Sequence, residues 1–359
     1  MNIKNYLKAF ILRSITKKNN LKFDIKNSKH VLMLRYDRIG DMIITTPVYR
    51  ELKRNYPEIQ ISVLASKSNS IILKDNPYVD NIYINNKNNL LLDLPTLLKL
   101  RKQRIDVCIE FDHSVVKHAI VRLQIIKPKK IISVQKDGRY GVSGNNLRIY
   151  DYYTPKKKDA HFSDIWLHTL KPFGILNGTK KYDLFFDQET DNSAKEFIDQ
   201  FNGKFLIYIN LEGAVKGKKI SKDDLKKICL GLHNICTDIK ILINYMPERE
   251  LQTDYIVSNI NLDYVSLSCK TKNILDAAAL IKYMDLVITP DTSIAHIAST
   301  FNTPVLTIHE KNYESYKLFA PTSELNRTIF SEKNNSLRGF SVKSLLDSAE
   351  ELITLIKRN

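Results

Sequence analysis

Short apolar runs alternate with helix-like segments along most of this chain, and that alternation constrains its fold more than any other feature. The apolar run Val31–Leu34 is followed by Met42–Tyr56, which carries apolar residues at helical spacing. A short continuous apolar run is typical of a strand buried on both faces. Strands that alternate with helices predict a parallel sheet covered by helices on both sides.

The alternation occurs in two series. In the first, we expect strands at 31–34, 60–65, 81–84, 106–111 and 131–134, and helices at 42–56, 70–74, 90–101, 115–126 and 161–173. In the second, we expect strands at 205–211, 240–244, 264–268 and 286–289, and helices from 221 and 247 and at 274–284 and 342–356. Turn residues over 174–187 predict a linker. The predicted fold class is α/β, with two doubly wound Rossmann-like domains, which 359 residues can supply.

The charge balance restricts the partners. The chain has 55 Lys and Arg against 39 Asp and Glu, a formal net charge of +16. Such an excess favours anionic partners. Because no nucleic-acid motif and no aromatic-rich stacking surface accompany the charge, we expect sugar phosphates or anionic lipids rather than nucleic acid.

The cysteines and the apolar runs exclude two further classes. The cysteines, which lack the spacing of a metal cluster, are Cys108, Cys229, Cys236 and Cys269. We expect them to be buried free thiols in a reducing compartment. No run of about eighteen apolar residues is present, so we expect no membrane-spanning helix.

Residues 1–30 form a basic amphipathic leader. Its apolar residues recur at helical spacing and are Ile3, Tyr6, Leu7, Phe10, Ile11 and Ile15. Lys8 and Arg13 interrupt this apolar part, so the segment does not resemble a signal peptide. Two interpretations remain open: a helix lying on an anionic membrane, or an additional helix packed on the protein's own core.

The segment Arg35–Pro47 carries the first candidate site. Asp41 follows the loop Tyr36–Gly40 and is expected at or near the N-cap of the next helix. Gly40 permits a sharp turn and the close approach of a ligand. An Asp at the carboxyl end of a parallel strand can act as a general base, although it can also serve only as a cap. We expect a kink at Pro47, or a new helix start there.

Three further polar residues in the first series are candidates for contact with an acceptor. Glu110 and Asp112 lie at a strand end, on one face, and could bind sugar hydroxyls. The favoured alternative is that both are solvated acids. His161 precedes a helix, and a surface or packing histidine is the simpler interpretation.

The second series carries two candidate phosphate sites. The loop Glu212–Lys219 is basic, and Lys216, Lys218 or Lys219 could bind phosphate there. Ser221 then begins a helix, with Asp224 in a capping-box-like pair.

After the expected strand 286–289, the side chains of Asp291, Thr292 and Ser293 can cap a helix whose N-terminus suits a diphosphate. His296 lies in the first turn and can donate to phosphate or sugar. The alternative is an ordinary cap with a histidine at the edge of the core.

Two motifs about 250 residues apart resemble the signatures of glycosyltransferase family 9, the ADP-heptose:lipopolysaccharide heptosyltransferases. They are Arg35–Pro47 with Arg50–Pro57, and Asp291-Thr-x-x-x-His296 before Thr303-Pro-Val-Leu. The resemblance departs at Ser293, which replaces a Gly, at Ile220-Ser221, which replaces Trp-Pro, and at His309–Asn312, which replaces a Gly-Pro-Thr segment.

The resemblance implies a GT-B-like fold in which two domains face a central cleft. Residues 31–175 would bind the acceptor, 176–335 the nucleotide-sugar, and a final helix at 336–359 would cross back to the first domain. Asp41 would be the catalytic base, and Lys218 would contact the donor phosphates. Glu248 or Glu250 would hold the nucleoside. The acceptor-side prediction comprises Arg38, Gly40, Glu110, Asp112 and His161.

The predicted activity is an inverting, metal-independent transfer of heptose from ADP-heptose to a lipopolysaccharide core sugar, without a cofactor. The enzyme would be cytoplasmic and peripheral on the inner face of the cytoplasmic membrane. The alternatives are a family member with another nucleotide-sugar or acceptor, and a non-catalytic protein that binds sugar phosphate or anionic lipid. A Rossmann dehydrogenase is disfavoured because no Gly-x-Gly-x-x-Gly follows the first strand.

Overall fold

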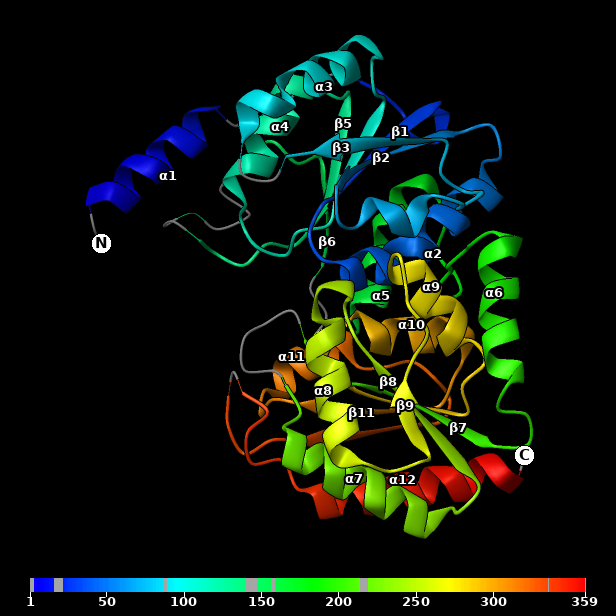
Figure 1. The fold of residues 1–359 in the computed structure, drawn as a ribbon. Helices are drawn as coiled ribbons and strands as arrows, with labels where there is room; N and C mark the ends of the chain where they lie inside the picture. Colours follow the sequence, from blue (N-terminus) through cyan, green and yellow to red (C-terminus); the bar gives the residue numbers. More distant parts are fainter. Residues whose placement is uncertain are drawn as a thin grey trace. The chain divides into compact units, whose positions relative to one another are not determined.

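The chain forms two compact units, Met1–Asp183 and Leu184–Asn359. The computed structural model describes residues 3–15, 22–86, 89–139, 142, 147–155, 159–213, 219–334 and 336–358. The boundary between the units falls inside the segment 174–187 that was expected to be a linker. Each unit contains one parallel sheet flanked by helices (Figure 1).

The first unit has the strand order β3-β2-β1-β4-β5-β6. Its strands are β1 (His30–Arg35), β2 (Gln60–Ser66), β3 (Asn81–Asn85), β4 (Val107–Glu110), β5 (Lys130–Val134) and β6 (Tyr152–Thr154). Its helices are α1 (Ile3–Ile15), α2 (Ile39–Asn55), α3 (Leu90–Lys102), α4 (Lys117–Ile126) and α5 (Phe162–Leu167), and its 3₁₀ segments are η1 (Ile25–Asn27), η2 (Ser70–Leu73) and η4 (His168–Phe173).

The second unit has the order β12-β11-β10-β7-β8-β9. Its strands are β7 (Phe205–Asn210), β8 (Ile239–Asn244), β9 (Val265–Leu267), β10 (Leu286–Pro290), β11 (Val305–His309) and β12 (Asn326–Phe330). Its helices are α6 (Gln188–Asp199), α7 (Lys222–Ile235), α8 (Glu250–Ile260), α9 (Ile274–Ile281), α10 (Ser293–Phe301), α11 (Tyr313–Phe319) and α12 (Val342–Arg358), with a 3₁₀ turn, η5 (Pro247–Arg249).

Numbered within each unit, both sheets have the order 3-2-1-4-5-6, which is the doubly wound Rossmann arrangement. The predicted fold class is thereby confirmed. In such sheets the strand order reverses beside the first strand, and ligands bind at the carboxyl ends of the strands there. These switch points lie between β1 and β4 and between β7 and β10.

The expected strands are all present, with ends that differ by at most one residue. Every residue of β1 and β10 is buried, in agreement with the apolar runs Val31–Leu34 and Leu286–Ile288 that they contain. The expected elements did not include β6, α6, β11, α11 or β12. The strands β6 and β12 are short or half-buried, so they lack the long apolar run that marks a central strand.

Helix α2 corrects two expectations. It begins at Ile39 with Arg38 as its N-cap, so Asp41, its third residue, lies near the N-cap as expected, but Gly40 lies within its first turn rather than in the expected loop. The helix continues through Pro47, so no new helix starts there. The Thr46 hydroxyl donates to the Ile43 carbonyl at 2.7 Å, within the same helix.

The leader helix α1 packs on the protein's own core, which is one of its two open interpretations. Ala9 and Leu12 are buried in the hydrophobic cluster that covers one side of the first sheet. Leu7, Phe10 and Ile11 lie on the outside and are exposed. The helix therefore packs on the first unit and leaves an apolar face outward.

None of the helices formed by the described residues is both long and apolar enough to cross a bilayer. The four cysteines are free thiols, as expected, and only Cys269 is not fully buried.

Candidate active site

Asp41 lies just beyond the carboxyl end of β1, and both of its carboxylate oxygens are held. Oδ2 accepts from the backbone N–H of Arg38 at 3.3 Å, and Oδ1 lies 3.0 Å from Nη2 of Arg35. The Asp41 side chain remains 14% exposed. At the switch point of the first sheet, this carboxylate is thus fixed in direction and still accessible.

Arg35, which sequence analysis did not single out, organises this edge of the sheet. Its guanidinium is buried, lies 3.5 Å from Asp37 and stacks 4.1 Å from the ring centroid of Trp166. Burial lowers the pKa of the guanidinium, but the carboxylates of Asp41, Asp37 and Asp112 outweigh this effect and raise it. The sequence feature that could have identified Arg35 is its position as a charged residue at the end of a buried apolar strand.

Glu110 and Asp112 differ from the expected pair of solvated acids. Glu110 is buried, forms an ion pair with Lys136, and accepts from the Ser133 hydroxyl at 2.8 Å and from the Asp112 N–H at 3.1 Å. Burial, followed by the nearby carboxylates of Glu110 and Asp37, raises the pKa of Asp112 well above its ordinary value. Glu110 anchors the strand end, and contact of either acid with an acceptor stays a prediction.

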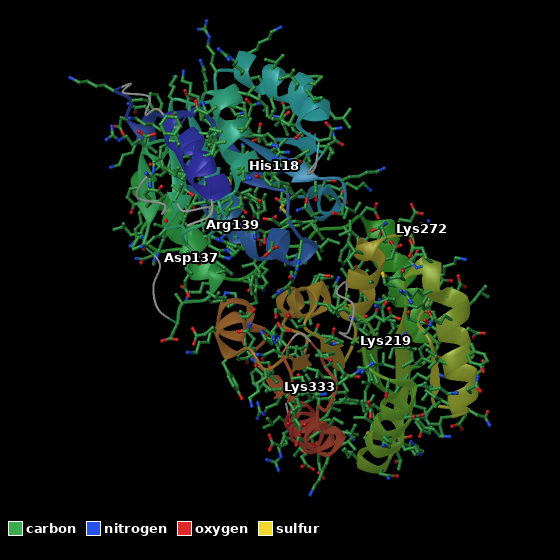
Figure 2. The ribbon with its side chains drawn as sticks, turned by 90° about the vertical axis from the view of Figure 1, so that its left-hand side faces the viewer. His118, Asp137, Arg139, Lys219, Lys272 and Lys333 are labelled. Carbon is green, nitrogen blue, oxygen red and sulfur yellow. The ribbon has the colours of Figure 1, made fainter. Side chains whose placement is uncertain are left out.

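The other acceptor-side candidates lie on the same unit. Arg38 is exposed at the N-cap of α2, and Gly40 is buried behind it. His161 is the N-cap of α5, where Nδ1 accepts from the Ser163 N–H at 3.1 Å. Figure 2 labels Asp137 and Arg139, which follow β5, and His118 of α4.

In the second unit, a polar network joins three strand ends at the switch point. Thr292 is the N-cap of α10 and accepts from the Ile294 N–H at 3.2 Å. The Asn210 amide donates to the hydroxyls of Thr289 at 3.0 Å and Thr292 at 3.3 Å, and its carbonyl accepts from Asn244. Thr292, rather than Asp291, therefore caps the helix, and Ser293 is its first residue.

The two ionisable side chains of the second motif, Asp291 and His296, contact different residues. Asp291 lies 3.5 Å from Nε2 of His309, the buried histidine at the end of β11. His296 is buried in α10, with its ring 6.5 Å from that of Phe319. His309 is the first residue of the segment His309–Asn312, which replaces the family's Gly-Pro-Thr. This replacement therefore lies directly beside Asp291 of the second motif.

The basic loop is only partly described, and the predicted Lys216 and Lys218 lie outside the described residues. Lys219, which is labelled in Figure 2, forms an ion pair with Glu212 at 2.7 Å, and the two residues also form an isolated antiparallel β-bridge. Arg249, a second cation that the sequence did not indicate, lies 3.4 Å from the same carboxylate.

The structure confirms the predicted helix cap after this loop, but it does not test the two acids predicted to hold the nucleoside. Ser221 caps α7 by accepting from the Asp224 N–H at 3.1 Å, as predicted. Glu248 is exposed in η5, and Glu250 begins α8 and pairs with Lys270 at 3.0 Å. Their contact with a nucleoside stays a prediction. Where side chains are described, no group of three His, Cys, Asp or Glu residues is placed to hold a metal ion.

Two doubly wound units, with a carboxylate at one switch point and a capped helix N-terminus at the other, place the chain in the class of GT-B-like folds. The chain belongs to glycosyltransferase family 9 (heptosyltransferase), whose family model matches residues 97–348. It is a glycosyltransferase, as the two motifs predicted.

Similar proteins agree with this assignment. The chain is 23% identical to "Putative lipopolysaccharide heptosyltransferase 4" of Escherichia coli, across 99% of this chain and 95% of that protein. A solved glycosyl transferase family 9 structure from Veillonella parvula superposes with a TM-score of 0.74 at 15% identity, covering 94% of this chain and all of that one. The E. coli heptosyltransferase WaaC with ADP gives a TM-score of 0.67 at 14% identity, with 90% and 99% covered.

Proposed function

We propose that this enzyme transfers heptose from ADP-heptose to a sugar of the lipopolysaccharide core, in a single inverting displacement. The family assignment and the lipopolysaccharide heptosyltransferase named among its relatives support the acceptor class. The solved WaaC structure, which shares the fold and contains ADP, supports the nucleotide. We infer no metal or cofactor requirement.

The observation that carries the proposal is the setting of Asp41. Its carboxylate is fixed by Arg35 and by the Arg38 N–H, yet part of it is exposed at a switch point. Asp41 removes the proton of the acceptor hydroxyl as that oxygen forms a bond to the anomeric carbon. The bond from the anomeric carbon to the diphosphate breaks, and the diphosphate leaves with the electron pair.

The second unit provides the donor site in this proposal. The N-terminus of α10, capped by Thr292, presents backbone N–H groups and partial positive charge, which suit a diphosphate. Lys218, His296 and one of the acids Glu248 and Glu250 would complete the site. Asp291, paired with His309, would contact sugar hydroxyls.

We place the enzyme on the inner face of the cytoplasmic membrane, as a peripheral protein. The outward apolar face of α1 (Leu7, Phe10 and Ile11), with the exposed Arg13 beside it, supports this placement. The acceptor would then be an anionic glycolipid in the same bilayer.

A second candidate is transfer from another nucleotide-sugar. The observation that favours it is the replacement of the Gly-Pro-Thr segment by His309–Asn312, since His309 lies against Asp291. A protein that only binds sugar phosphate or anionic lipid is the non-catalytic alternative.

One experiment separates these candidates. We would screen ADP-heptose and other nucleotide-sugars for thermal stabilisation, because a ligand at 100 times its Kd adds about 2.7 kcal/mol. Donors that stabilise the protein would then be tested for turnover with lipopolysaccharide core acceptors. Stabilisation by ADP-heptose and turnover support the proposal. If a different nucleotide-sugar stabilises the protein and ADP-heptose does not, transfer from that other donor is supported. If donors bind but none is turned over, the non-catalytic alternative is supported.

A further inference from the structure

Helix α3 of the first unit buries an acid and exposes several leucines. It buries Asp93 with Leu97 and Leu100, while Leu91 is 80% exposed, Leu92 62% and Leu98 43%. A helix on the surface of a globular protein normally turns its leucines to the core and its acids to water. The outward leucines of α3 therefore need a separate explanation.

A buried ion pair fixes this orientation. The Arg122 guanidinium of α4 is fully buried and donates to Asp93 from Nε at 3.0 Å and from Nη2 at 2.5 Å. The other Asp93 oxygen accepts from the Asn86 N–H at 2.6 Å. Rotation of α3 to bury its leucines would leave Arg122 as an unpaired buried charge, which is strongly unfavourable. The helices α3 and α4 lie side by side in Figure 1.

The charge on the outer face of α3 has one sign. Lys99, Arg101 and Lys102 are exposed at its C-terminal end, and Asp93, its sole acid, points inward. Exposed leucines with adjacent bases are typical of helices that lie on anionic membranes. In a symmetric contact between two copies, neither face would supply an acid to pair with these bases.

We propose that the outer face of α3 docks on an anionic lipid bilayer, as a contact additional to that of α1. The proposal rests on the membrane location proposed above. Both helices contribute to one hydrophobic cluster, through Ala9 and Leu12 of α1 and Leu97 and Leu100 of α3. Two weak contacts on one unit reinforce each other, because the first raises the effective concentration of the second.

The test is co-flotation of the full chain with vesicles of phosphatidylcholine alone or mixed with phosphatidylglycerol. The variant Leu91→Ser/Leu92→Ser/Leu98→Ser should bind the mixed vesicles at least about tenfold more weakly than the wild type. Leu251→Ser is the matched control, because Leu251 is an 87% exposed leucine on α8 of the other unit, and it should bind as the wild type does.

A second variant tests the charges. Lys99→Gln/Arg101→Gln/Lys102→Gln should weaken binding to the mixed vesicles and leave binding to phosphatidylcholine unchanged. All substituted side chains are exposed, so thermal unfolding should match the wild type. Wild-type binding by both α3 variants would overturn the inference. It would also be overturned if sedimentation showed a wild-type dimer that only the leucine variant converts to a monomer, because the outer face of α3 would then bind a second copy of the chain.

A leader variant, Leu7→Ser/Phe10→Ser/Ile11→Ser, separates the two membrane proposals. If it loses binding while both α3 variants keep it, the α3 inference fails and the placement through α1 stands. If the wild type does not bind anionic vesicles, both proposals are wrong. If the leader variant and the α3 variants each lose binding to the mixed vesicles, both membrane proposals are supported.

Discussion

Arg35 and Asp41, which are six positions apart, form an ion pair in which Nη2 and Oδ1 are separated by 3.0 Å. The pair joins the last residue of β1 to the first turn of α2. The guanidinium also stacks on the ring of Trp166. The direction of the carboxylate is thus set by a buried, planar partner rather than by the helix alone, and this relationship underlies the first two predictions.

Asp41→Asn should reduce kcat by at least about a hundredfold, because the amide cannot take the acceptor proton. The neutral amide leaves the buried Arg35 guanidinium with the longer contact to Asp37, so the variant should also lower the free energy of unfolding. Steady-state kinetics and denaturant unfolding measure the two quantities. A near-normal kcat would place the base on another residue.

Arg35→Lys should lower kcat by about tenfold or more and also destabilise the first unit. A lysine keeps the charge but loses the planar fork and the stack on Trp166. The matched control is Lys53→Met, which removes an ion pair with Asp80 near the surface of the same unit and should change stability by about 1 kcal/mol or less. Unchanged kinetics in Arg35→Lys would show that the pair does not position Asp41.

Asp112→Asn should stabilise the protein at neutral pH more than at acidic pH. The pKa of Asp112 is raised in the folded state, by burial and then by Glu110 and Asp37. Its contribution to stability is therefore full below the unfolded pKa of about 3.9 and is lost as the pH rises through the folded pKa. Urea unfolding of both proteins at pH 4.5 and 7.5 checks this. An equal difference at the two pH values would contradict it.

Donor binding should depend on the second unit alone. Lys218→Ala and His296→Ala should each weaken the binding of ADP, whereas Asp41→Asn should not. Lys226→Ala, which removes an exposed lysine of α7, is the control for a general loss of positive charge. Calorimetric titration with ADP measures the affinities. Wild-type affinity in both second-unit variants would mean that the motif only caps α10.

Activity should persist in EDTA. The proposed leaving-group stabilisation uses the α10 N-terminus and Lys218, which supply positive charge without an ion. Initial rates would be compared with and without EDTA, and after addition of Mg²⁺ or Mn²⁺. A rate that is lost in EDTA and restored by either ion would refute metal independence.

Local patterns predicted the elements that decide the fold class. The strands β1 and β10 contain the apolar runs Val31–Leu34 and Leu286–Ile288, and such runs identify buried strands without knowledge of their neighbours. The edge strands β6 and β12 were not predicted, because their half-buried residues carry no such pattern. The sequence also located Asp41 and the Asp291–His296 motif, because each lies where an apolar run ends and helical spacing begins.

Only the tertiary structure decided how these residues are partnered. The pairing of Asp93 with Arg122 and of Glu110 with Lys136 crosses between separate elements, so no local spacing encodes it. Likewise Asn210 reaches Thr292 only because β7 and β10 are neighbours in the sheet. The sequence by itself determined the elements, the class of fold and the two motifs, through short-range periodicity and capping. Strand order, burial and the partners of each charge depend on contacts between distant segments, which only the folded chain brings together.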